Sequence, residues 1–209
     1  MFKKTDHLQH EKKLKIKTIC QIIMGTKTEG VTDTVTSLQL LEKNQDKAKT
    51  KKKLLVTSGL TLSGIAARAL LQHLPSVSPI IAIAAATGYF YDTKYGFSSG
   101  TTGYIASNFL VWGGQGPWTI FQALGAGLAG ITGGSIGKIT QSKTGYFTSM
   151  IIGTILFEIS VNVGGILFVP YATASLLTYF LASLPYGFVH LISTLSFGSM
   201  IYGFKQNFR

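Results

Sequence analysis

The chain has 209 residues, of which only 13% are charged, and its net charge is +11. A soluble domain carries about 25% charged residues, and the charges here are concentrated at one end. Residues 1–53 hold 13 lysines and 6 acids, whereas residues 54–209 hold eight charged residues altogether. Eight charges are too few to cover the surface of a soluble domain of that size, so composition predicts a membrane protein.

Residues 1–53 are interpreted as a basic cytoplasmic extension that is solvated and partly helical. Lysines next to a span also favour anionic lipid, whereas nucleic-acid binding is disfavoured because Phe2 is the sole aromatic residue of the extension. The single cysteine, Cys20, excludes an internal disulfide. The apolar run near it is too short for a cleavable signal peptide, so the first span is expected to direct insertion.

Residues 54–209 are predicted to form a substrate-binding domain of six transmembrane helices. The expected spans are 54–74, 79–91, 95–112, 118–139, 146–169 and 185–204. Pro185 divides the last apolar segment, because proline cannot donate to the helix ladder. Residues 172–184 are therefore interpreted as an apolar cap at the membrane surface.

The distribution of basic residues tests this count. Six spans put both termini on the same side, which then carries the basic extension together with Lys94, Lys138, Lys143, Lys205 and Arg209. The opposite loops contain no lysine or arginine. Cytoplasmic loops are the ones enriched in these residues, so an all-α, multi-pass protein of the plasma membrane is predicted, with its N and C termini in the cytoplasm.

Small residues recur every four positions in two of the spans. Gly59, Ser63 and Ala67 form such a row in the first, and a second row in the fourth comprises Gly125, Ala129 and Gly133. Rows of this kind let helix backbones approach closely in lipid. Packing inside the protein is expected for the row of the fourth span, whereas the first row suits either internal packing or an external partner.

Several polar side chains are expected at membrane depth, where ionisable groups are costly unless partnered. They are Arg68, Asn108, Gln122, Glu158, Asn162 and His190, with Trp112, Gln115 and Trp118 at the rim above them. Glu158 is the only acid in any predicted span, and Asn162 follows it one helical turn later. Simpler interpretations are interfacial belt residues for the tryptophans, interhelical hydrogen bonds for the amides, and a buried imidazole for His190.

Enzyme motifs are absent from the sequence. There is no P-loop, no HExxH and no G-x-S-x-G, so no catalytic residue, metal ligand or cofactor is predicted.

Two blocks of residues resemble the substrate-binding (S) component of energy-coupling factor transporters. The closer one comprises Ser107, Asn108, Phe109, Gly116, Pro117, Trp118, Thr119 and Gln122. The other is Leu-Pro-Tyr-Gly-Phe-Val-His at 184–190, in which the family has Asp at the position of Gly187. The similarity extends over residues 54–204 and leaves the basic extension outside.

The resemblance implies a six-helix protein that captures a vitamin or related micronutrient outside the cell. It also implies docking, through the row at Gly59, Ser63 and Ala67, on a membrane coupling protein that two cytoplasmic ATPases drive. A stand-alone facilitator or channel is the alternative, and a membrane scaffold without a solute is a third possibility. Stacking by Trp112, Trp118, Tyr171 and Tyr186 suits a flat, polar-edged heteroaromatic vitamin or modified base, and a corrinoid remains an alternative.

Overall fold

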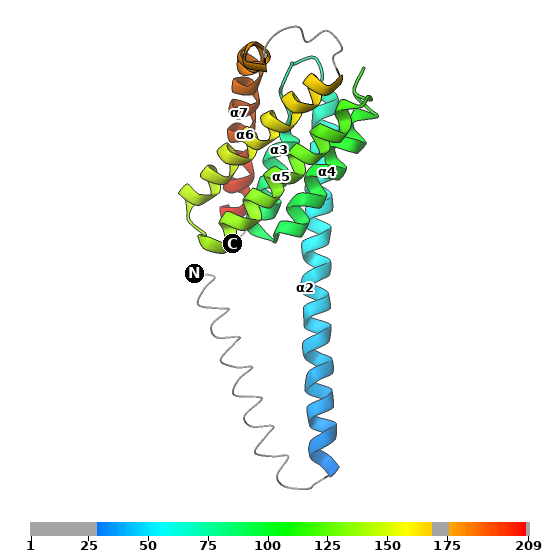
Figure 1. The fold of residues 1–209 in the computed structure, drawn as a ribbon. Coiled ribbons are helices and arrows are strands. Elements are labelled where there is room, and N and C mark those ends of the chain that lie inside the picture. Colours follow the sequence, from blue (N-terminus) through cyan, green and yellow to red (C-terminus); the bar gives the residue numbers. More distant parts are fainter. Residues whose placement is uncertain (1–28, 169–175, 208–209) are drawn as a thin grey trace. The chain divides into compact units, whose positions relative to one another are not determined.

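The computed structural model describes residues 29–168 and 176–207 (Figure 1). The regular secondary structure of this part of the chain is entirely α-helical. Its helices are α2 (Glu29–Leu70), α3 (Pro79–Phe90), α4 (Thr93–Asn108), α5 (Trp118–Ile139), α6 (Lys143–Phe168) and α7 (Leu176–Asn207). The predicted features at residues 1–28 and at Tyr171 lie outside the described residues.

The chain divides into two compact units between Lys53 and Leu54. Helix α2 is continuous across this point, although charge and hydropathy change there abruptly. Residues 42–53 are mainly Lys, Gln, Glu and Ala and include neither Gly nor Pro. These residue types favour helix, which explains why the helix does not begin at Leu54, where the apolar segment begins.

Three of the described helices are long and apolar enough to cross a membrane: α5, α6 and the part of α7 at Thr178–Gln206. A hydrocarbon core about 30 Å thick requires roughly 20 mainly apolar residues in helical form. Helix α3 is also apolar but has only 12 residues. These helices identify the chain as a membrane protein.

The division of the last segment at Pro185 was wrong. Helix α7 runs from Leu176 to Asn207 with Pro185 inside it, so residues 176–184 are its first turns rather than a separate cap. Figure 1 shows these turns at an angle to the remainder of the helix. Proline is tolerated inside membrane helices because neighbouring groups satisfy the backbone that it frees, and it bends the helix.

The predicted third span, 95–112, also ends earlier in the structure. Helix α4 stops at Asn108, and a turn follows in which Gly113 has a φ of 64°. Glycine adopts this left-handed conformation without steric cost. The turn leads to Trp118, the first residue of α5 and the predicted start of the fourth span.

The core is built around α3, which contacts α4, α5, α6 and α7. Every residue of α3 from Pro79 to Tyr89 is buried. Alanines and glycines allow this close packing: a Cβ atom added to Gly133 of α5 would overlap the backbone of Ala85 in α3. Gly125 and Ala129 are also buried, so the small-residue row of the fourth span does pack internally, as predicted.

Candidate functional site

Asn108 is the centre of a buried hydrogen-bond network at the end of α4. Its side-chain oxygen accepts from Arg68 Nη1 at 2.5 Å, and its Nδ2 donates to Thr119 Oγ1 at 2.9 Å and to Gln122 Oε1 at 2.8 Å. Arg68 also donates to Ser107 Oγ at 2.6 Å. The network joins α2, α4 and α5, and Asn108 is only 1% exposed.

Local helical geometry assembles this network. Thr119 and Gln122 are three residues apart in the first turns of α5, so both lie on the face that meets the end of α4. Arg68 is in the last turn of α2, and its guanidinium lies 4.6 Å from the ring centroid of Tyr104. The cation is thus held by a hydroxyl, an amide and an aromatic face.

A second polar group joins α6 to α7. His190 Nδ1 and Glu158 Oε1 are in hydrogen-bond contact, and their side chains are 16% and 20% exposed. Asn162, one turn further along α6, donates from Nδ2 to the backbone oxygen of Glu158 at 2.9 Å. A carboxylate at membrane depth requires a partner, and His190 is that partner.

Aromatic rings connect the two groups. The ring of Tyr104 lies 5.1 Å from that of Phe157, and Phe157 makes an edge-on contact of 5.3 Å with His190. Tyr104 and Phe157 are both about 1% exposed. The network around Asn108 and the pair Glu158–His190 are therefore two ends of one continuous set of side chains whose central rings are buried.

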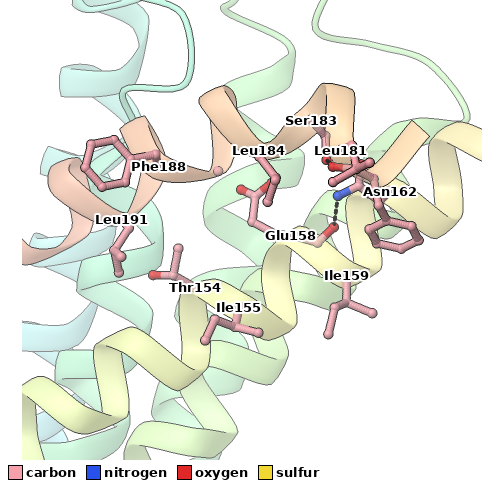
Figure 2. A pocket seen from close by; sticks show the side chains of 12 residues that line it. Thr154, Ile155, Glu158, Ile159, Asn162, Leu181, Ser183, Leu184, Phe188 and Leu191 are labelled. Atoms are coloured by element: carbon pink, nitrogen blue, oxygen red, sulfur yellow. Dashed lines mark hydrogen bonds between the residues drawn. The ribbon is translucent and has the colours of Figure 1, made fainter. Parts of the chain in front are cut away.

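A pocket of about 360 Å³ lies between α6 and α7, beside Glu158. Its lining residues are mostly apolar: Thr154, Ile155, Glu158, Ile159 and Asn162 from α6, and Phe180, Leu181, Ser183, Leu184, Gly187, Phe188 and Leu191 from α7. Figure 2 shows Glu158 and Asn162 below the turns of α7 that carry Leu184 and Ser183. The lining residues of α7 lie on both sides of Pro185. The bent part of α7 therefore forms one wall of the pocket.

The predicted rim residues do not join this pocket. Trp112 is 94% exposed, and Gln115 is also exposed. Trp118 is partly exposed, and its Nε1 donates to the Gly114 carbonyl at 3.1 Å. Tyr186 is not one of the twelve lining residues and is 56% exposed. Exposed aromatic side chains at helix ends are typical of the membrane interface.

Four polar participants were not among the predicted site residues: Ser107, Thr119, Thr154 and Ser183. The first two carried a usable signal, because Ser107 adjoins Asn108 and Thr119 precedes Gln122 by three residues. Thr154 likewise precedes Glu158 by one helical turn. Ser183 gave no comparable signal, since its position depends on the continuation of α7 through Pro185.

Comparisons with protein-family models, curated proteins and solved structures find no match to this chain. Among the described residues, no group of three or more His, Cys, Asp or Glu side chains could hold a metal ion. Functional inference therefore depends on the pocket, the two polar groups and the sequence blocks that contain them.

Proposed function

We propose that this chain is the S component of an energy-coupling factor transporter. In this proposal it captures a vitamin or related micronutrient at the outer face of the plasma membrane, and a separate module of one membrane coupling protein and two ATPases drives uptake. The observation that carries the proposal is the pocket between α6 and α7, which contains Glu158 and Asn162. A solute-sized cavity beside the only acid of the predicted spans suits a binding site better than it suits a packing defect.

The arrangement of the polar groups supports an outer-face site. The first turns of α7 and the α4–α5 connection lie at the same end of the helix bundle in Figure 1. The loops predicted at that end have no Lys or Arg, and the opposite loops have several. By the distribution of basic residues in membrane proteins, the pocket then opens toward the outside and both termini are cytoplasmic.

The exposed row on α2 supports docking on a partner. Ser63 is exposed, and a Cβ atom added to Gly59 would meet no atom within 4 Å. The internal row on α5 behaves differently, because its glycines touch the backbones of α3 and α6. Small exposed residues on a membrane helix allow another helix to approach closely, which is the contact that the coupling protein would make.

The function is tested by purifying the chain gently and identifying a retained small molecule by mass spectrometry. The same preparation is probed for co-purifying coupling protein and ATPases, and the identified molecule is assayed for ATP-dependent uptake. Solute flux through liposomes that contain this chain alone would instead establish the stand-alone facilitator. Absence of both the ATPases and ATP-dependent uptake would contradict the proposal.

Docking is tested separately with Ser63→Leu, which fills the row on α2. This variant should lose the complex with the coupling protein and keep solute affinity within a few-fold. Ser58→Leu is the matched control, because Ser58 is exposed on the same helix but lies away from the row. Loss of solute binding together with docking in Ser63→Leu would mean that the row serves internal packing.

Topology is tested with single cysteines introduced into a background that lacks Cys20. A cysteine at Gly114 should react with an impermeant reagent from outside, and cysteines at Asp92 and Ser142 only from inside. Labelling at Asp92 from outside would overturn the six-span arrangement.

A further inference from the structure

The pocket between α6 and α7 has a pronounced charge asymmetry. Of its twelve lining residues, Glu158 is the only ionisable one. Arg68 is held by Ser107, Asn108 and the ring of Tyr104 and does not line the pocket. A solute in this pocket therefore meets the carboxyl group of Glu158 and no lysine or arginine.

The carboxylate of Glu158 keeps one oxygen for a further partner. Oε1 is paired with His190 Nδ1. Within residues 29–168 and 176–207, the structure gives no hydrogen bond to Oε2, which lies 3.4 Å from the position that a Cβ on Gly187 would occupy. A side chain larger than hydrogen at position 187 would approach this oxygen, so glycine leaves space beside it.

The other polar lining groups also present acceptors. The hydroxyls of Thr154 and Ser183 donate to the carbonyls of Met150 and Phe180, both at 2.8 Å, which leaves their oxygen lone pairs available. Asn162 donates through Nδ2 to the carbonyl of Glu158, so its Oδ1 can accept. Hydrogen-bond acceptors require donors on the ligand, and unpaired acceptors at membrane depth are costly.

We propose that this pocket binds an organic cation: an apolar or aromatic body with a protonated amine or a similar N–H-bearing cationic group. The ammonium donates to Oε2 of Glu158, and the body packs against the leucine, isoleucine and phenylalanine side chains of α6 and α7. Phe180 and Phe188 are the aromatic residues of the lining, and aromatic rings attract cations. This inference rests on the proposed solute-binding function and names the charge class of the solute.

The test uses three probes of similar size on the purified full chain in detergent at pH 7: benzylammonium, benzyl alcohol and phenylacetate. Apparent affinity is taken from the dose dependence of the melting temperature. Benzylammonium should bind at least about tenfold more tightly than benzyl alcohol, as expected for a hydrogen bond to a charged partner. Phenylacetate should bind more weakly than either.

Glu158→Gln should reduce the preference for benzylammonium over benzyl alcohol to about twofold or less, because the amide keeps the shape and loses the charge. Asp92→Asn is the matched control. It removes one negative charge from the same chain at the N-cap of α4, outside the pocket, and asparagine caps equally well. This variant should retain the full preference.

Three outcomes would each overturn the inference. They are benzylammonium binding no tighter than benzyl alcohol, absence of binding by all three probes, and an unchanged preference in Glu158→Gln.

A lipid amine is distinguished from a free solute by repeating the titration in nanodiscs. Competition by phosphatidylethanolamine, absent with phosphatidylglycerol, would assign the pocket to lipid. Loss of the cation preference with intact ATP-driven uptake would refute this inference alone, whereas cation binding without a coupling module would refute the proposed transporter role alone.

Discussion

Backbone atoms of α3, α4 and α5 approach one another directly at their glycines, whereas the glycines of α7 that face α6 meet side chains. A Cβ atom on Gly130 of α5 would overlap the backbone of Gly96 in α4, and one on Gly88 of α3 would overlap Gly130. At the other interface, Gly198 of α7 faces the side chain of Met150, and Gly187 faces that of Glu158.

This difference separates a rigid part of the bundle from an adjustable one. Backbone atoms in direct contact cannot move without separating whole helices, while side chains can change rotamer around a solute. Buried residues are also sparse in the described part of α7, where Ser193, Thr194 and Gly198 are the buried ones. The pocket lies at the adjustable interface, and the Asn108 network anchors the rigid one.

The largest effect is expected from Gly130→Ala. Its methyl group would overlap the backbone of Gly96, so α4 and α5 must separate, and the folded state should lose about 3 kcal/mol or more. The measurement is the thermal unfolding temperature of the purified protein. Gly203→Ala is the matched control, because nothing lies within 4 Å of its added Cβ, and it should be neutral or stabilising by up to about 1 kcal/mol. Equal unfolding temperatures of the two variants would refute the close contact between Gly130 and Gly96.

Asn108→Leu should have the next largest effect. The change removes the partner of Thr119 and Gln122 and one of the two acceptors of Arg68. Buried polar groups left unpaired cost about 1–3 kcal/mol, so the free energy of unfolding should fall by about 2–3 kcal/mol. Gln115→Leu, in the exposed part of the α4–α5 connection, should leave stability nearly unchanged. An unaltered melting temperature for Asn108→Leu would show that the network is not a structural anchor.

At the adjustable interface, Glu158→Gln should affect binding more than folding. Loss of the charge should weaken affinity for the retained solute about ten- to a hundredfold, corresponding to about 1.5–3 kcal/mol. Glu158→Leu should abolish binding, because it also removes the acceptor. Affinity and melting temperature are measured on both variants. Normal affinity in folded Glu158→Leu, with lowered stability, would assign Glu158 a purely structural role.

The smallest effect is expected from Pro185→Ala, which restores a backbone donor and allows α7 to straighten. Since the pocket is lined by Ser183 and Leu184 before the proline and by Gly187 and Phe188 after it, affinity should fall a few-fold, by less than about 1.4 kcal/mol. Isothermal titration of the retained solute measures this change. An affinity equal to that of the unmodified protein would show that the bend does not shape the pocket.

Local signals predicted two helices closely. The expected spans 79–91 and 118–139 agree with α3 and α5, because Ser78 and Pro79 begin the first and Pro117 precedes the second. Pro185 misled the prediction because the tolerance of proline depends on neighbouring helices rather than on the flanking sequence. The sequence predicted Trp112 near the site because hydropathy does not distinguish the end of α4 from the apolar turn that follows it.

The sequence by itself determined that the chain is helical and apolar enough for a membrane, and that Glu158 is the one acid in its predicted spans. Composition and hydropathy are local properties, so they can be read without coordinates. Only the tertiary structure decided that Asn108 pairs with Arg68, that Glu158 pairs with His190, and that a pocket lies between α6 and α7. Those pairings depend on the rotation and depth of each helix. Both are determined by contacts between residues that are distant in sequence.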